Sequence, residues 1–144
     1  MERAILFACT LNAVRSPMAA ALLRHLTRGR LYIESAGVKA GELDPLAVEA
    51  MAEIGLEIGK HRPRRFEDLE DGSFDLVITL SPEAQHKAME LTRTAATQVE
   101  YWPTLDPTVV DGSREQRLAA YRGVRDQLME RLKARFLTPM AGDI

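Results

Sequence analysis

The chain has 144 residues, of which 46% are hydrophobic and 28% charged, and its formal net charge is −2. This length predicts a single domain over residues 1–144 that is built around one core. The near-neutral charge gives no basic footprint for nucleic acid. No apolar run reaches the roughly 18 residues that predict a membrane span, so we expect neither a nucleic acid nor a membrane as partner.

Cys9 is the only cysteine of the chain. One cysteine excludes an internal disulfide and favours a reducing, cytoplasmic setting. Together with three dispersed histidines it leaves no metal constellation, so we predict neither a metal nor another cofactor. The first apolar segment begins almost at once, which leaves no room for a signal peptide.

The first third of the chain predicts a strand, a helix and a second strand. An apolar strand is expected at about 3–8, and a second strand at about 31–36. Ser16 and Pro17 are a helix start signal, with Ser16 as N-cap and Pro17 at the first helical position. The helix is expected to run to Arg28, with Gly29 as its C-cap.

Strands and helices continue to alternate in the rest of the chain. The further elements expected in chain order are a helix opened by Asp44 and Pro45 and ended by Gly55, a strand at 74–80, a helix capped by Ser81, a short strand at about 98–102 and a last helix with the capping box Ser113 and Gln116. This alternation predicts an α/β fold, a three-layer sandwich in which helices cover both faces of a four-stranded parallel sheet. A loosely ordered tail is expected after about residue 137.

Cys9 ends the first apolar strand and stands six positions before Arg15. The loop between strand and helix makes an oxyanion cradle, because loop amides and the helix N-terminus point at a bound anion. The same donors stabilise a thiolate, and an arginine grips two phosphate-like oxygens at once. The spacing Cys-x5-Arg therefore suggests attack by sulfur on an oxyanion centre. The alternative interpretation of Cys9 is a small buried hydrophobic residue.

Residues 9–19, Cys-Thr-Leu-Asn-Ala-Val-Arg-Ser-Pro-Met-Ala, resemble the signature of the low-molecular-weight protein tyrosine phosphatases, whose fold is shared by the thioredoxin-coupled arsenate reductases. The resemblance runs through nearly the whole chain. Further matches in the family's order are Ser35-Ala36-Gly37, Asp44-Pro45, His61 with Arg64, and Asp106-Pro107. It implies the family's phosphotyrosine protein phosphatase I-like fold.

The resemblance implies a catalytic set of Cys9, Arg15 and Asp106. Cys9 attacks phosphorus and forms a phospho-cysteine intermediate, while Arg15 stabilises the charge of the transition state. Asp106 first protonates the leaving group and then activates water. The residues expected to bind the phosphate are Thr10, Leu11, Asn12, Ala13, Val14, Arg15 and Ser16. For Asp106 the alternative is an ordinary Asp-Pro turn, and Asp111 is a competing carboxylate that we assign to a turn.

By the same resemblance Asn12 shapes the cradle, and Ser16 donates a hydrogen bond to the sulfur. The sequence departs from the family pattern at Leu11, where the family usually has glycine, and at Val14, where it has a second cysteine. Leu11 is expected to alter the cradle, because glycine alone adopts positive φ freely. The residues just after Asp106-Pro107 are Thr108 and Val109 rather than aromatic ones, and the loop 38–43 has no aromatic residue either, which puts a preference for phosphotyrosine in doubt.

These observations favour a cysteine-dependent phosphomonoester hydrolase, a low-molecular-weight protein tyrosine phosphatase that acts as a monomer or weak dimer. Its expected partner is a phosphorylated protein, a small phosphomonoester or another oxyanion. An arsenate reductase of the thioredoxin-coupled kind is excluded, because it needs two further cysteines. A single-cysteine arsenate reductase that uses a low-molecular-weight thiol remains open, and the stretch 101–107 with its long final helix resembles the reductases. A non-catalytic phosphate-binding protein is the third alternative, supported by Leu11.

Overall fold

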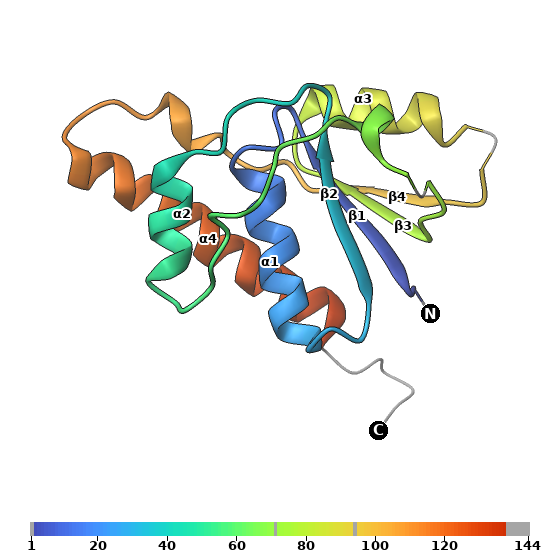
Figure 1. Cartoon of the computed structure of the whole chain (residues 1–144), viewed down its shortest axis with the longest axis horizontal. Coiled ribbons are helices and arrows are strands. Elements are labelled where there is room, and N and C mark those ends of the chain that lie inside the picture. The colour runs from blue at the N-terminus through green and yellow to red at the C-terminus, as the bar shows by residue number, and fades with distance from the viewer. Residues whose placement is uncertain (1, 71, 94, 138–144) are drawn as a thin grey trace.

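The computed structural model describes residues 2–70, 72–93 and 95–137, and the predicted tail lies outside them. The elements in chain order are β1 (Ala4–Cys9), α1 (Arg15–Thr27), β2 (Tyr32–Gly37), α2 (Pro45–Ala52), the 3-10 turn η1 (Phe66–Asp68), β3 (Leu76–Thr79), α3 (Pro82–Leu91), β4 (Gln98–Tyr101), the 3-10 turn η2 (Pro107–Val109) and α4 (Arg114–Phe136) (Figure 1). The alternation of strands and helices predicted from the sequence is confirmed.

The four strands form one parallel sheet in the order β2-β1-β3-β4. Ile5 of β1 pairs with Ile33 of β2 on one side and with Leu76 of β3 on the other. Because all strands are parallel, their carboxyl ends meet at one edge of the sheet. The chain leaves β1 toward β2 on one side and continues with β3 on the other, which opens a crevice between the ends of β1 and β3. Ligands of open α/β sheets bind at such a point.

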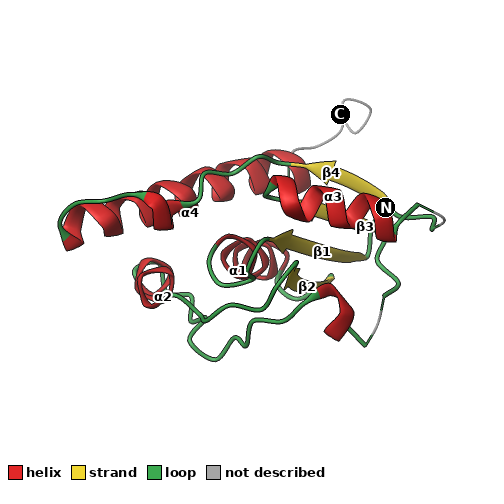
Figure 2. Ribbon diagram, turned by 90° about the horizontal axis from the view of Figure 1, so that it is seen from above, coloured by secondary structure: helices red, strands yellow, loops and turns green. Residues whose placement is uncertain are grey.

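Side chains of β1 alternate between two apolar cores, one on each face of the sheet. Ile5 and Phe7 belong to the larger core, which is built with α1, α2 and α4. Leu6 and Ala8 point to the smaller core, which contains residues of α3 and η1. Figure 2 shows α1 and α2 apart from α3, with the long helix α4 running above α1 and α2. The predicted α/β architecture, with helices on both faces of a parallel sheet, is therefore confirmed.

The start and the end of α1 differ from the prediction. The helix begins at Arg15 with Val14 as its N-cap, so Ser16 is its second residue and caps nothing. The helix ends with Arg28 as C-cap in the left-handed conformation, at a φ of 53°, and Gly29 follows at a φ of 74°. The predicted N-cap was wrong because the hydroxyl of Ser16 is used by the cradle instead.

The other helix starts are as predicted. The three caps are Asp44, which accepts from the amide of Leu46, Ser81, which accepts from the amide of Ala84, and Ser113, which forms a capping box with Gln116. Each satisfies amides that have no partner within the helix. Asp44 and Ser81 thereby fix two helix N-termini beside the end of β1.

Across the described parts of the chain, none of the helices combines the length and the apolar character that crossing a membrane requires.

Candidate active site

The segment after β1 is a tight loop whose carbonyl oxygens accept hydrogen bonds from a neighbouring loop. Cys9 is the last residue of β1, and its exposed fraction is 2%. Four carbonyl oxygens accept backbone hydrogen bonds from the neighbouring loop 38–44, in the pairs Val38 to Cys9, Lys39 to Thr10, Gly41 to Leu11 and Asp44 to Ala13. These bonds fix the loop against the segment that follows β2.

The amides of the same loop have no such partners. The backbone N–H groups of Leu11, Asn12, Ala13 and Val14 donate no hydrogen bond to any group in the ranges that the structure describes. Asn12, Ala13 and Val14 are at most 7% exposed. Buried amides in proteins are nearly always paired, so several unpaired donors in one short loop indicate an anion site. The first turn of α1 adds the positive end of its dipole at the same place.

The backbone conformation shows why Leu11 can stand where the family usually has glycine. The positive φ of the loop, 54°, belongs to Asn12, a residue type that tolerates it, and Leu11 has none. A glycine is instead required at Gly37, because a Cβ there would lie 2.5 Å from the carbonyl oxygen of Lys39 and 2.8 Å from the amide of Asn12. The loop therefore accommodates Leu11, a residue that is 45% exposed and lines the cavity over the cradle.

Ser16 brings its hydroxyl to the sulfur of Cys9. The two atoms, Cys9 Sγ and Ser16 Oγ, are 3.0 Å apart and buried. Asn12 Nδ2 donates to Ser16 Oγ at 2.8 Å. The proton of that hydroxyl has two acceptors within reach, the sulfur of Cys9 and the carbonyl oxygen of Ala36 at 3.4 Å, and the sulfur is the nearer of the two. This is the placement that the resemblance implies for Ser16.

Asn12 is the centre of a buried polar network behind the cradle. Its Nδ2 also donates to Ser35 Oγ at 2.9 Å, and its Oδ1 accepts from the amide of Arg64 at 3.0 Å. His61 Nε2 lies 3.0 Å from the same Oδ1 and 3.2 Å from the carbonyl oxygen of Asn12. Because both partners are acceptors, Nε2 must carry the proton of a neutral His61. Ser35, His61 and Arg64, which lie far apart in the sequence, thus all contact Asn12.

Burial is the main cause that lowers the pKa of His61 below its ordinary value of 6.5, and the charges of Arg64 and Arg24 act in the same direction. The hydrogen bond to Asn12 and the charge of Glu34 oppose this shift. Glu34 also pairs with Arg64. The ring is therefore held neutral as a donor to Asn12 near neutral pH.

Arg15 and Asp106 come together over the loop, although 90 positions of chain separate them. Arg15 Nη2 lies 4.0 Å from Asp106 Oδ2, and Arg15 Nη1 donates to the carbonyl oxygen of Thr104 at 3.0 Å. The amides of Trp102 and Thr104 donate to the end of β3, at Thr79 and Leu80, which fixes this loop to the sheet.

Asp106 presents one of its two oxygens to the site. Oδ1 accepts from the amide of Thr108 at 3.0 Å and from its hydroxyl at 2.7 Å. Oδ2 is the oxygen on the side of Arg15, and the carboxyl side chain is 40% exposed. Asp106 lines the same cavity as Cys9, whereas Asp111 does not. Of the two candidate carboxylates, only Asp106 therefore lies at the cradle.

The cavity over the cradle measures about 610 Å³ and contains residues that the sequence analysis did not single out as a site. Glu42 and Glu83 line it, together with Asp44, whose Oδ2 accepts a 2.6 Å hydrogen bond from Tyr121 on α4. No spacing signal links these carboxylates to Cys9. Only the docking of the loop 38–44 and of α3 against the cradle brings them there.

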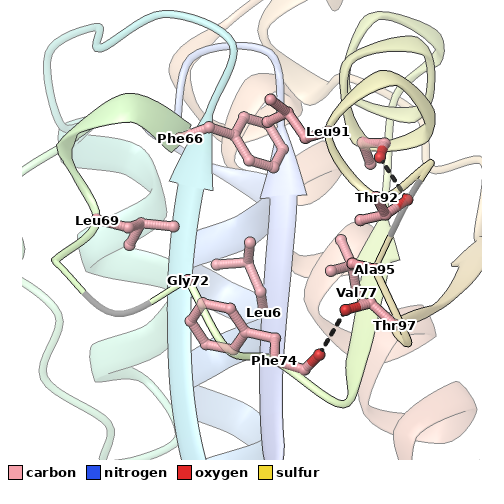
Figure 3. A pocket seen from close by; sticks show the side chains of 11 residues that line it. Leu6, Phe66, Leu69, Gly72, Phe74, Val77, Leu91, Thr92, Ala95 and Thr97 are labelled. Atoms are coloured by element: carbon pink, nitrogen blue, oxygen red, sulfur yellow. Dashed lines mark hydrogen bonds between the residues drawn. The ribbon is translucent and has the colours of Figure 1, made fainter.

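A second hollow, of about 230 Å³, lies on the other face of the sheet (Figure 3). Phe66 and Phe74 lie at its two ends, with Leu6 between them. The hydroxyls of Thr92 and Thr97 donate to the carbonyl oxygens of Ala88 and Phe74. Among the residues that the structure describes, those that line the hollow carry no charge, and none of them lines the cavity over the cradle.

Among the residues whose placement is described, no three histidine, cysteine, aspartate or glutamate side chains form a group that could hold a metal ion.

Comparisons with known proteins find similarity to phosphatases and to arsenate reductases. The family model "Low molecular weight phosphotyrosine protein phosphatase" matches residues 4–140. An arsenate reductase of Shouchella clausii is 35% identical over 92% of this chain and 94% of its own length. The structure of the YwlE arginine phosphatase, in a cysteine-to-serine variant with a phosphorylated active-site serine, is 28% identical and superimposes with a TM-score of 0.71 over 90% of each chain.

A low-molecular-weight protein tyrosine phosphatase from T. tengcongensis shares the fold, with a TM-score of 0.75 at 24% identity over 94% of this chain and 98% of that one. The family match covers all the residues from which the cradle, the polar network and the Asp106 loop are built. The chain belongs to the low-molecular-weight phosphotyrosine protein phosphatase family.

Proposed function

We propose that the protein is a cysteine-dependent phosphomonoester hydrolase of the protein tyrosine phosphatase kind. The observation that carries the proposal is the set of unpaired amides from Leu11 to Val14 beside the sulfur of Cys9. These donors, the N-terminus of α1 and the guanidinium of Arg15 all favour the negatively charged oxygens of a phosphoryl group. The site holds the oxyanion against the one thiol of the chain.

In the first step the thiolate of Cys9 attacks phosphorus, a sulfur–phosphorus bond forms and the bond to the ester oxygen breaks. Arg15 and the loop amides stabilise the charge that spreads over the equatorial oxygens. Asp106, with Oδ2 toward Arg15, gives its proton to the leaving oxygen. The leaving group departs as a neutral alcohol or phenol.

In the second step Asp106 takes a proton from water, and the water oxygen attacks phosphorus. The sulfur–phosphorus bond breaks and Cys9 leaves as thiolate. The Ser16 hydroxyl, 3.0 Å from the sulfur, stabilises this leaving thiolate by donating a hydrogen bond. Inorganic phosphate is then released. No redox change accompanies either step.

The direct test is hydrolysis of p-nitrophenyl phosphate, without added metal, by the wild type and by Cys9→Ser. We expect turnover by the wild type and none by the variant, which should unfold at a similar denaturant concentration. Phosphoarginine belongs in the same substrate panel, because one structural neighbour is an arginine phosphatase. Equal turnover by both proteins, or none by either, would contradict the proposal.

The second candidate is reduction of arsenate with a low-molecular-weight thiol. It is favoured by the 35% identity to an arsenate reductase, and Cys9 is the only cysteine available for it. Cys9 sulfur displaces water from arsenate, and an external thiol then attacks that sulfur. The electron pair of the sulfur–arsenic bond leaves with arsenic as arsenite, and a second thiol releases Cys9 from the mixed disulfide. Arsenite formation that needs both Cys9 and added thiol, without ester hydrolysis, would favour this candidate.

A further inference from the structure

The cavity over the cradle has an acidic rim, which is unusual for a site that binds an anion. Among the described residues that line it, Arg15 contributes the one guanidinium, and the four carboxylates are Glu42, Asp44, Glu83 and Asp106. The proposed reaction uses Asp106, and Asp44 is occupied by the amide of Leu46 and the hydroxyl of Tyr121. Glu42 and Glu83 have no part in the proposed reaction. Within the described ranges, neither forms an ion pair.

Glu42 is held at the rim by the backbone. It follows Gly41, whose amide donates to the carbonyl oxygen of Leu11 at 2.9 Å. A Cβ on Gly41 would lie 3.0 Å from the Cβ of Leu11, so the two segments are in close contact. The exposed side chain of Glu42 therefore starts from a fixed point beside the Leu11 side chain.

Glu83 reaches the cavity from a different element. It lies in the first turn of α3, two residues after the N-cap Ser81. Thr10 Oγ1 donates to Ser81 Oγ at 3.0 Å and lies 3.5 Å from Glu83 Oε1. The N-terminus of α3 is thereby attached to the residue that follows Cys9. The two exposed glutamates thus approach the mouth of the cavity from the loop 38–44 and from α3.

Leu11, which lines the same cavity, offers an apolar surface there, because the residue is 45% exposed. A phosphate dianion entering this rim is repelled by the carboxylates unless the substrate also carries positive charge. An alkyl stem that ends in an ammonium or guanidinium group matches both features, since such side chains lay their stems on apolar surface and keep the charge at its edge.

We propose that the preferred substrate is a phosphorylated peptide with a lysine or arginine next to the phosphorylated residue. The basic side chain packs its stem on Leu11, and its cation lies between Glu42 and Glu83. This inference rests on the proposed phosphatase function, and it assigns the specificity of the same cavity to two residues that take no part in the bond-breaking steps.

The test measures binding of fluorescent phosphotyrosine peptides to the Cys9→Ser variant, so that no turnover is needed. Three peptides differ only in the residues flanking the phosphotyrosine, which are lysine, alanine or glutamate. We expect the lysine peptide to bind about three- to tenfold more tightly than the alanine peptide, and the glutamate peptide most weakly, as two exposed charge pairs imply. Added salt should reduce the differences between the three dissociation constants, because it screens exposed charges.

The double substitution Glu42→Gln with Glu83→Gln should bring the three dissociation constants within about twofold of one another. Glu130→Gln, on the exposed side of α4, is the matched control and should leave the preference unchanged. Equal binding of the three peptides, or a preference that survives the double substitution, would overturn the inference. Turnover of p-nitrophenyl phosphate by the wild type separates this failure from failure of the phosphatase proposal.

Discussion

Cys9 Sγ and Ser16 Oγ lie 3.0 Å apart, joined across the cradle rather than along a helix. Ser16 is the second residue of α1, and its hydroxyl accepts from Asn12 and lies closer to the sulfur than to its other acceptor, the carbonyl oxygen of Ala36. A residue that looks like a helix cap in the sequence is therefore a partner of the candidate nucleophile. The contact matters most when the sulfur carries a negative charge, which happens before the first step and after the second.

Ser16→Ala is expected to slow the second step more than the first. Loss of a hydrogen bond to a charged group costs about 1.5–3 kcal/mol, or about ten- to a hundredfold in rate. Rapid mixing with p-nitrophenyl phosphate should then show a burst of nitrophenol followed by slow turnover. Ser113→Ala, at the cap of α4, is the control and should lower stability without producing a burst. A Ser16→Ala variant with the kinetics of the wild type would remove the hydroxyl from the mechanism.

Asp106→Ala should affect substrates according to their leaving groups. An aryl phosphate with a poor leaving group needs the proton from Asp106 and should lose about 10²–10⁴ in kcat/KM, while one with a good leaving group loses far less. Because kcat/KM reports the first irreversible step, the base role of Asp106 does not enter it. Asp111 lies outside the cavity, so Asp111→Ala should leave kcat/KM unchanged for both substrates. An equal loss for both substrates would count against Asp106 as the acid.

His61 should make the stability of the fold depend on pH. Burial lowers its pKa in the folded state, so below the unfolded value of 6.5 the unfolded chain binds a proton that the folded chain does not. The free energy of unfolding should therefore fall as pH decreases from about 7 toward the lower folded pKa. Denaturant unfolding at several pH values should show a smaller fall in His61→Gln. The exposed His25→Gln is the control, and an unchanged slope in His61→Gln would refute the assignment.

Tyr121 connects α4 to the beginning of α2 beside the cavity. Its hydroxyl donates to Asp44 Oδ2 at 2.6 Å, and burial together with this carboxylate raises the pKa of Tyr121. Tyr121→Phe should lower the free energy of unfolding by about 1–3 kcal/mol, because Asp44 loses a donor. The exposed Tyr101→Phe should cost less than about 0.5 kcal/mol. A Tyr121→Phe variant as stable as the wild type would show that water replaces the lost hydroxyl.

The fold was predictable because local signals agree with the global arrangement. Continuous apolar runs mark the central strands, and Asp44, Ser81 and Ser113 cap the helices at the predicted positions. The prediction of Ser16 as a helix N-cap was wrong because a serine before proline gives the same local sequence pattern whether its hydroxyl contacts an amide or a sulfur. Tertiary contact decided between the two.

The candidate site was predictable only in part. The spacing of Cys9 and Arg15 is local, so the sequence carries it, and the family resemblance supplied Asp106. Glu42 and Glu83 reach the cavity through the docking of separate elements, which leaves no periodic or spacing signal. The effect of Leu11 was also beyond the sequence, because a positive φ at Asn12 instead becomes visible only in the folded loop.

The most direct test of the central claim is to find the covalent intermediate. Asp106→Ala, which lacks the proposed base of the second step, is mixed with p-nitrophenyl phosphate, denatured at neutral pH and weighed by mass spectrometry before and after digestion. The account predicts a mass increase of one phosphoryl group, located on the peptide that contains Cys9 and absent from the Cys9→Ser, Asp106→Ala double variant. Nitrophenol release without any adduct, or a phosphoryl group on another residue, would contradict it.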